Sequence, residues 1–155
     1  MLDDIAPLRQ WTSDLSSAGV HLLTPADAVR RTDPAVIDYY LKEAADRVTL
    51  EILDEAGTIV RTFTGTPEDA KKGPGGDGVP VVGTRAGLNR FTWDLRYPGA
   101  TVFPGMILWR ARPELGPWAP PGSYQVRLMA NAQTQTRAFT VRLDPRIGNV
   151  SPADL

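Results

Sequence analysis

The chain has 155 residues, which suits one domain with a substantial core and is short for two. Its 17 Lys and Arg residues nearly balance 18 Asp and Glu residues, and the sequence lacks the basic stripe of a nucleic-acid-binding protein. The absence of cysteine excludes disulfides, zinc–thiolate sites and cysteine nucleophiles. No apolar run approaches the roughly 20 residues that span a bilayer.

The N-terminal segment, residues 1–34, shows no sustained hydrophobic period and is expected to be irregular. Within it, "TPADAVRR" (24–31) predicts one or two helical turns, with Thr24 as the N-cap and Pro25 in the first helical position. The 14 glycines and 14 prolines exceed their usual share, which favours short strands joined by turns in the rest of the chain.

Alternation of apolar and polar residues begins at residue 35. In "AVIDYYLK" (35–42), Ile37, Tyr39 and Leu41 share one face, which is typical of a half-buried strand. An open sheet has edge strands, and we expect residues 35–42 or 136–143 to form an edge that accepts a strand from another copy of the chain.

The next two strands form a predicted hairpin. "RVTLEILD" (47–54) and "TIVRTFT" (58–64) alternate in the same way, and "EAG" between them ends in Gly57, which tolerates the positive φ of a tight turn. Residues 65–86 are rich in glycine and charge, lack a period, and are predicted to form a mobile loop. Within them, "GPGGDGVP" (73–80) lacks the residue spacing of phosphate-binding and calcium-binding loops.

The stretch "GLNRFTWDLRYPGA" (87–100) carries a dense group of aromatic residues. Counting in twos separates two faces, with Phe91, Trp93, Leu95 and Tyr97 on one and Arg90, Thr92, Asp94 and Arg96 on the other. Four large apolar side chains describe a core face, worth several kcal/mol if buried at roughly 25 cal/mol per Å². We therefore predict that these aromatics point inward. The outward charges form either a surface ion-pair ladder or a contact with a neighbouring domain.

The proline-rich insertion at 98–122 holds three aromatic candidates for a ligand or partner contact: Phe103, Trp109 and Trp118. Prolines restrict the loop, so that an aromatic side chain can be held exposed at low entropic cost and stack on a sugar ring or fill a partner's pocket. The alternative is that the insertion folds over one end of the strands and the tryptophans plug it. We favour the plug for Trp109 and leave both interpretations open for Trp118.

The last hairpin is predicted from "SYQVRLMA" (123–130) and "TRAFTVRL" (136–143), joined by "NAQT". In the tail, 147–155, Ser151 is a suitable N-cap and Pro152 suits the first helical position. We expect a helix to start there and to be truncated by the end of the chain.

Together these elements predict an all-β protein. About seven short strands with alternating faces, joined by Gly/Pro turns, are typical of a β-sandwich of the immunoglobulin or fibronectin III type. The absence of paired cysteines distinguishes it from an antibody-type domain. We expect the sandwich to span residues 35–146, between the irregular segment 1–34 and the tail 147–155.

The sequence presents no convergent catalytic or metal-binding group. His21 is the sole histidine, no G-x-S-x-G motif supplies it with a nucleophile, and one histidine without cysteine argues against a transition-metal site. Paired acids such as Asp54 and Glu55 are sequence neighbours at a turn, where acidic residues serve turn geometry and solubility. We therefore predict a chain without catalytic residues, cofactor or metal.

Four segments carry a resemblance to a known family: "VTLEILDEAGTIVRTF", "GLNRFTWDLR", "PPGSYQVRL" and "AFTVRLDPR". In this order they resemble the C-terminal module of bacterial sortilin-like proteins, large secreted proteins of the BNR-repeat or glycosyl-hydrolase-like kind that are built around a β-propeller. The likeness covers residues 35–146 and is most specific at "GLNRFTWDLRYPGA…FPGMILW". The sequence also resembles, less closely, the Ig-like domain of the flagellar hook-capping protein. At residues 30–36, "RRTDPAV" departs from the Asn-Pro-Pro-type stretch that is frequent in the family.

The resemblance implies a non-catalytic accessory domain that is secreted or periplasmic, with the β-propeller of the same parent protein as its partner. Segment 1–34 would then follow the propeller, and the domain would mediate docking or assembly, with Arg90, Asp94 and Arg96 as candidate contacts. The hydrolase label of the family does not transfer to this module. The alternative is a carbohydrate-binding module that uses Trp109 and Trp118. Glycan binding and self-association through edge strands remain open, and neither nucleic acid nor membrane insertion is expected.

Overall fold

The computed structural model describes residues 19–71, 80–100 and 115–146. These residues form ten strands and one short helix, and the protein is therefore mainly β, as predicted. The elements are β1 (Val20–Leu22), β2 (Ala28–Val29), β3 (Ala35–Leu41), β4 (Val48–Leu53), β5 (Ile59–Gly65), α2 (Pro67–Lys71), β6 (Gly87–Trp93), β7 (Arg96–Pro98), β8 (Leu115–Trp118), β9 (Gly122–Ala130) and β10 (Gln133–Arg142). Among the described residues, no helix is long and apolar enough to cross a membrane.

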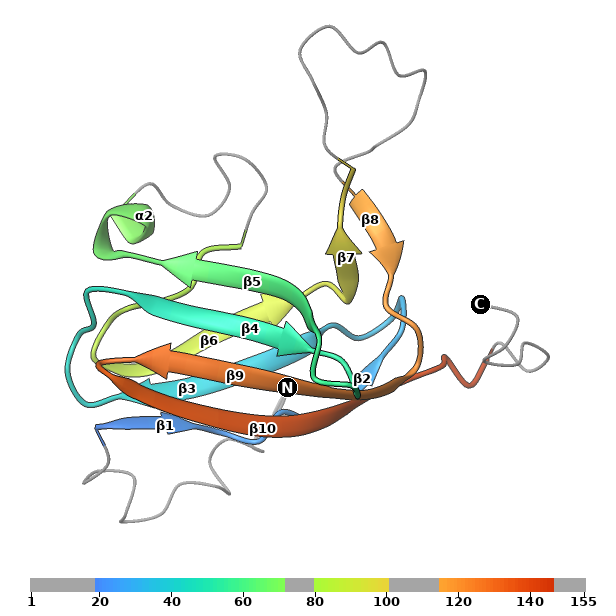
Figure 1. Cartoon of the computed structure of the whole chain (residues 1–155), viewed down its shortest axis with the longest axis horizontal. Coiled ribbons are helices and arrows are strands. Elements are labelled where there is room, and N and C mark those ends of the chain that lie inside the picture. The colour runs from blue at the N-terminus through green and yellow to red at the C-terminus, as the bar shows by residue number, and fades with distance from the viewer. Residues whose placement is uncertain (1–18, 72–79, 101–114, 147–155) are drawn as a thin grey trace, which may run out of the picture.

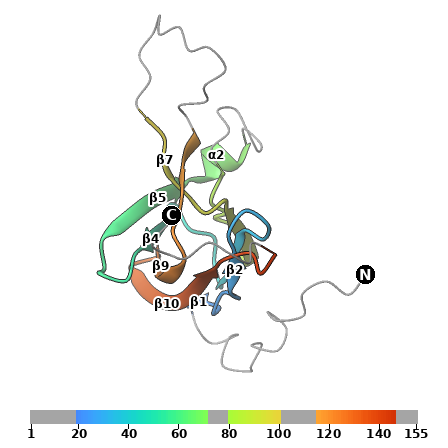
Figure 2. The same cartoon turned by 90° about the vertical axis from the view of Figure 1, so that its right-hand side faces the viewer.

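The strands form two larger sheets and one small one (Figure 1). One sheet has five strands in the order β2-β10-β9-β4-β5, and the other has three in the order β1-β3-β6. Neighbouring strands run antiparallel except β2 and β10, which pair in parallel over two residues. The third sheet is the β7–β8 pair, which projects from the body in two perpendicular views (Figures 1 and 2).

The core lies between the two larger sheets and is built by alternation. Phe63 of β5 lies 4.7 Å from Phe91 of β6, centroid to centroid, and Trp93 of β6 lies 5.9 Å from Tyr124 of β9 and 6.3 Å from Phe139 of β10. These ring contacts join the three-stranded sheet to the five-stranded sheet. The predicted inward residues of β3 are buried, and so are the alternating apolar residues of β4 and β9: Val48, Leu50, Ile52, Tyr124, Val126 and Leu128.

The stretch 87–100 confirms the predicted inward face but not a continuous strand. Phe91, Trp93 and Leu95 are fully buried, and Tyr97 packs partly buried against the core. However, β6 ends at Trp93, because Leu95 adopts a positive φ of 60° and turns the chain into β7, which pairs with β8. Period-two counting identifies which side chains face inward, and it does not detect a bend that leaves this parity intact.

Both predicted hairpins form, with tight turns. Gly57 takes a φ of 81° between β4 and β5. Asn131 and Ala132, with φ of 48° and 62°, form the two-residue turn between β9 and β10, since Gln133 pairs directly with Ala130. The predicted four-residue turn is therefore too long, and the last strand starts three residues before the predicted Thr136.

A short helix lies where a structureless loop was predicted. α2 begins after Thr66, whose amide and hydroxyl donate to Asp69 Oδ2 at 3.1 and 2.7 Å, while the Asp69 amide donates back to Thr66 Oγ1 at 3.4 Å. This reciprocal pair is a capping box, with Pro67 in the first helical position. The Thr-Pro-x-Asp signal is visible in the sequence. Residues 72–79, including most of the glycine-rich stretch, lie outside the described residues.

The described part of the N-terminal segment, residues 19–34, combines two short strands with turns and irregular stretches. It holds β1 and β2, which pair with β3 and β10, and no helical turn forms within residues 24–31. Strands of three and two residues are too short to show a period. Here the backbone hydrogen bonds come from neighbouring strands, which overrides the local signal of Thr24 and Pro25 for a helix.

The expectation that residues 35–42 form an edge strand is wrong, because β3 lies between β1 and β6. β10, which contains most of residues 136–143, lies between β9 and β2, although β2 pairs only with its last two residues. The rest of this margin faces β1. There the side-chain oxygen Oε1 of Gln135 accepts from the Leu22 backbone amide at 2.8 Å, and Gln135 Nε2 donates to the Val20 carbonyl at 2.9 Å, so one side chain joins the two sheets.

Candidate functional site

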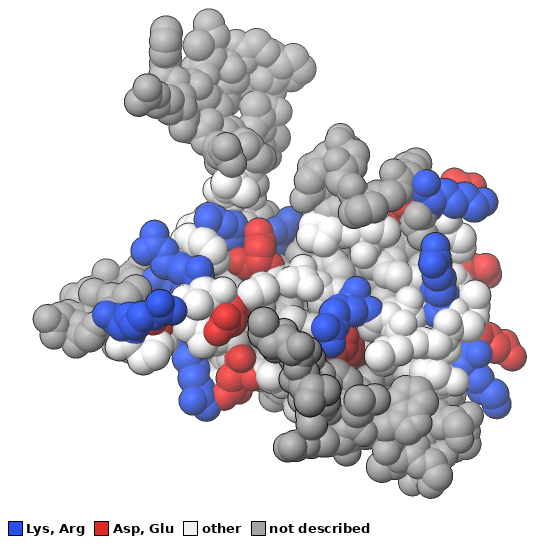
Figure 3. Space-filling model, turned by 180° about the vertical axis from the view of Figure 1, so that it is seen from behind, with Lys and Arg blue, Asp and Glu red and all other residues white. Residues whose placement is uncertain are grey.

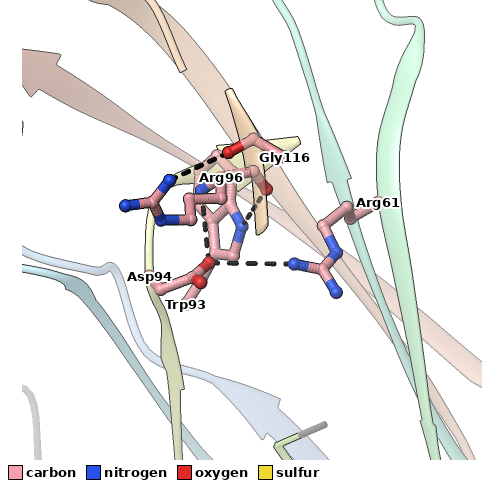
Figure 4. A network of polar contacts seen from close by, with 5 residues as sticks. All are labelled: Arg61, Trp93, Asp94, Arg96 and Gly116. Atoms are coloured by element: carbon pink, nitrogen blue, oxygen red, sulfur yellow. Dashed lines mark hydrogen bonds and ion pairs between the residues drawn. The ribbon is translucent and has the colours of Figure 1, made fainter. Parts of the chain in front are cut away.

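The base of the β7–β8 pair is an aromatic and charged corner (Figure 4). The Arg96 guanidinium carbon lies 3.9 Å from the centroid of the Trp118 ring, and Arg96 Nη1 donates to the Gly116 carbonyl at 2.9 Å. Trp93 Nε1 donates to the Arg96 carbonyl at 3.1 Å, which ties this corner to the core. A Cβ on Gly116 would lie 1.9 Å from the Tyr97 carbonyl oxygen, so that only glycine allows β8 to approach β7 this closely.

Asp94 connects the corner to the five-stranded sheet. Its Oδ1 accepts from the Arg96 amide at 3.2 Å and lies 3.8 Å from Arg61 Nη1 of β5. The Asp94 side chain is about half exposed, so its ion pair with Arg61 contributes little to stability. Its structural role is to hold the bend at Leu95 beside β5.

Beside Trp118 the surface is hollowed, with a volume of about 140 Å³. The apolar walls of this Trp118 hollow are Val29, Pro34, Leu95 and Trp118. The polar residues around it are Arg31, Thr32, Asp33 and Asp94. Pockets that enclose a drug-sized ligand have about 300–1,000 Å³. The hollow is therefore too small for a cofactor and large enough for one side chain or one ring.

Two strained residues line the hollow. Arg31 has a φ of 72° and Leu95 a φ of 60°, and the only other non-glycine residues with positive φ among those described form the β9–β10 turn. The turn at Arg31 is fixed by the amides of Thr32 and Asp33, which both donate to the Val29 carbonyl. Leu95 is fixed by its carbonyl, which accepts from the Ala119 amide at 2.7 Å. Strain held in this way concentrates at binding and active sites, because the surrounding fold must maintain it.

Opposite charges stand at the rim. Arg31 and Asp33 are both exposed, and neither side chain forms a hydrogen bond or ion pair with the rest of the described chain. Between them, Thr32 Oγ1 donates to Asp144 Oδ2 at 3.0 Å. The pKa of Asp144 is lowered, chiefly by the hydrogen bond from the Arg146 amide. The rim thus holds a cation and an anion that are not paired with each other or with another described residue.

The structure brings together three of the six predicted contact residues: Asp94, Arg96 and Trp118. Trp118 is half-buried, with one ring face beneath Arg96, so it is neither a complete plug nor a free platform. Arg90 lies apart from them on β6, where it donates from Nε and Nη2 to the buried carboxylate of Asp38 at 2.8 Å each. Phe103 and Trp109 lie outside the described residues.

The contribution of residues 29–34 to the hollow was not predicted, because that segment was expected to be irregular. The available signal was "RTDP" at 31–34, a turn-forming sequence that itself carries two opposite charges. A positive φ at an arginine has no sequence signature, because the surrounding contacts impose it.

His21 is the sole histidine of the sequence, and its surroundings bear on catalytic and metal-binding chemistry. His21 lies on β1 opposite Tyr40, and burial, followed by the nearby Arg137, lowers its pKa. No group of three His, Asp or Glu side chains within the described ranges is arranged to hold a metal ion. On the face seen in Figure 3, acidic and basic side chains are interspersed over the described surface, without a patch of one sign.

No protein-family model matches the chain, and a search of curated proteins finds no significant match.

Proposed function

We propose that this chain is a non-catalytic accessory module with an Ig-like or fibronectin III-like sandwich, which docks on a neighbouring domain or partner through the Trp118 hollow. The observation that carries the proposal is the hollow itself. It is apolar within and charged at its rim, and the bends that shape it are fixed by backbone hydrogen bonds. A central apolar anchor site surrounded by polar groups is the usual form of a protein-docking surface.

Strand order supports the sandwich. In an Ig domain, strands A, B and E are neighbours in one sheet, and C′, C, F and G are neighbours in the other. The orders β1-β3-β6 and β5-β4-β9-β10 correspond to these two sheets. The short β2, parallel to β10, then extends the second sheet at its G strand.

A tyrosine contact supports the same assignment. Tyr124 stands near the start of β9, the strand in the F position, and its hydroxyl donates to the Pro120 carbonyl at 2.8 Å. Ig-like domains contain such a tyrosine corner near the start of strand F, with the hydroxyl bonded to the backbone a few residues upstream. "PPGSY" is the corresponding stretch of sequence.

We further propose that the partner is the β-propeller of a secreted sortilin-like parent protein. This step rests on the sequence resemblance over residues 35–146. The parent reading frame should then encode a propeller, and calorimetry should detect its binding to the chain. Trp118→Ala should weaken binding about tenfold or more, as expected for an interface hot spot. Leu88→Ala is the control, because Leu88 is exposed on β6 and does not line the hollow. A parent without a propeller, or equal effects of the two variants, would contradict the proposal.

Carbohydrate binding is the competing function, and the Arg96 stack counts against it. A sugar ring stacks on an open aromatic face, and the guanidinium already covers one face of Trp118. Titration of tryptophan fluorescence with a polysaccharide panel separates the two functions. Saturable quenching that is lost in Trp118→Ala would favour the glycan, and an unchanged spectrum would favour docking.

A further inference from the structure

We propose that the Trp118 hollow takes one apolar side chain, of leucine or proline size, from an extended peptide segment of the partner, whose flanking charged residues pair with Arg31 and Asp33. The inference rests on the proposed docking function and specifies the kind of partner.

The size and the walls of the hollow select the anchor. At about 140 Å³ it holds a single side chain, and its walls are Val29, Pro34, Leu95 and the indole of Trp118. A polar anchor would lose its hydration without gaining a partner from these walls. An aliphatic anchor would remove its own surface and that of the walls from water, which is the main favourable term of such contacts.

The hollow is shaped before the partner arrives. Val29 lies in β2, hydrogen-bonded on one side to β10, and Leu95 is held at its bend by Ala119. The Arg96 guanidinium on the Trp118 ring, itself bonded to Gly116, fixes the indole. A wall that is already ordered adds little entropic cost on binding, so that one small anchor suffices for measurable affinity.

The two rim charges favour a partner segment that carries charges of both signs. In an extended peptide, residues i and i±2 point to the same side, about 6.6 Å apart. If residue i enters the hollow, residues i−2 and i+2 face the rim, where Arg31 and Asp33 have no other partner in the described chain. We therefore expect a segment with one acidic and one basic residue near the anchor, and the simplest such segment places them two positions away on either side. The order of the two charges sets the direction in which the peptide lies.

The probes are capped pentapeptides titrated into the ¹⁵N-labelled chain and followed by NMR. They are Ac-Glu-Ser-Leu-Ser-Lys-NH₂, the reversed Ac-Lys-Ser-Leu-Ser-Glu-NH₂, and Ac-Glu-Ser-Gly-Ser-Lys-NH₂. The leucine peptides should shift the Val29 and Leu95 amides and the Trp118 indole N–H, and the glycine peptide should bind about tenfold or more weakly. One of the two orientations should bind more tightly.

Asp33→Ala should abolish the preference for one orientation while the leucine peptides still bind. Asp33→Asn is the second variant if the alanine change disturbs the turn, and Asp46→Ala, an exposed acid that does not line the hollow, is the control that should change nothing. Equal binding of the leucine and glycine peptides, or shifts outside the hollow, would overturn the inference. So would stronger shifts of the same signals by methyl glucoside.

These outcomes are separable from the docking proposal. Propeller binding that depends on Trp118, combined with no leucine-dependent shift, would refute the peptide mode and leave docking intact. Leucine-dependent shifts without propeller binding would support the peptide mode and refute the propeller as partner.

Discussion

The body of the protein and the Trp118 corner are built by different means. In the body, apolar residues alternate along β4, β9 and β10, tight turns join the strands, and large side chains meet across the core. In the corner, three segments that are distant in sequence meet. Their contact depends on the arginine stacked on Trp118, on two residues with positive φ, and on a glycine at a position that leaves no room for a Cβ. The body provides stability, whereas the corner uses part of it to hold a strained, partly exposed surface. Binding surfaces commonly have this second character.

The largest expected effect, which tests this difference between body and corner, comes from replacing one tryptophan in each region. Trp93 is fully buried and touches Tyr124 and Phe139, so Trp93→Ala should lower the free energy of unfolding by about 3–5 kcal/mol. Trp118→Ala removes a half-buried ring and its arginine stack and should cost only about 1–2 kcal/mol. Urea unfolding of both variants measures the difference. Equal costs would mean that the corner is part of the core.

A smaller effect should come from Gln135, where the two sheets meet. Gln135→Ala removes both hydrogen bonds to β1 and should cost about 1–3 kcal/mol, because the Leu22 amide and the Val20 carbonyl lose their partner. Amide hydrogen exchange at Leu22 should accelerate more than exchange in β4. Gln133→Ala, two residues earlier and exposed, serves as the control. Unchanged protection of Leu22 would contradict the role given to Gln135.

These two regions also differ in how far they can be predicted from sequence. The strands with at least six residues, the inward residues and both hairpins follow from local period and turn chemistry, as the series Val48, Leu50 and Ile52 illustrates. Strands β1, β2, β7 and β8 have two to four residues, too few for a period. They form because they share backbone hydrogen bonds with strands that are distant in sequence. A local pattern of residues therefore does not predict them.

For the candidate site, the sequence indicated which residue types to expect but not how they are arranged. Trp118 was selected as an aromatic residue of the proline-rich insertion, and Asp94 and Arg96 as outward charges of the preceding strand, and the three do meet. Alternation also selected Arg90, which pairs with Asp38 elsewhere, because it cannot detect that the chain bends after Trp93. Arg31 could not have been selected, since its place at the hollow depends on a positive φ that the turn imposes.

Alkaline pH offers a test of the body alone. Burial raises the pKa of Tyr39, whose hydroxyl donates to the Gly83 carbonyl at 2.5 Å. Above pH 10 the unfolded chain releases this proton and the folded chain retains it, so stability should fall as pH rises, by up to about 1.4 kcal/mol per pH unit. Tyr39→Phe should lessen this slope, although it also costs a hydrogen bond at neutral pH. Burial likewise raises the pKa of Tyr124, so part of the fall in stability with pH should remain in Tyr39→Phe. An unchanged slope in Tyr39→Phe would show that Tyr39 does not cause it.

The smallest expected effect is confined to the corner. Arg96→Lys keeps the charge but loses the planar guanidinium that stacks on Trp118 while it donates to Gly116. We expect a cost of about 0.5–1 kcal/mol, close to the error of a denaturation curve, so the sensitive measurement is local. The Trp118 indole N–H resonance should shift and broaden, while that of Trp93 keeps its position. The Trp93 indole donates to the Arg96 carbonyl, so a change at Arg96 can reach the core through this hydrogen bond. If the Trp93 resonance moves as much as that of Trp118, the corner and the body are structurally coupled. If only Trp118 responds, the corner can vary without disturbing the body, as a docking surface carried on a stable scaffold requires.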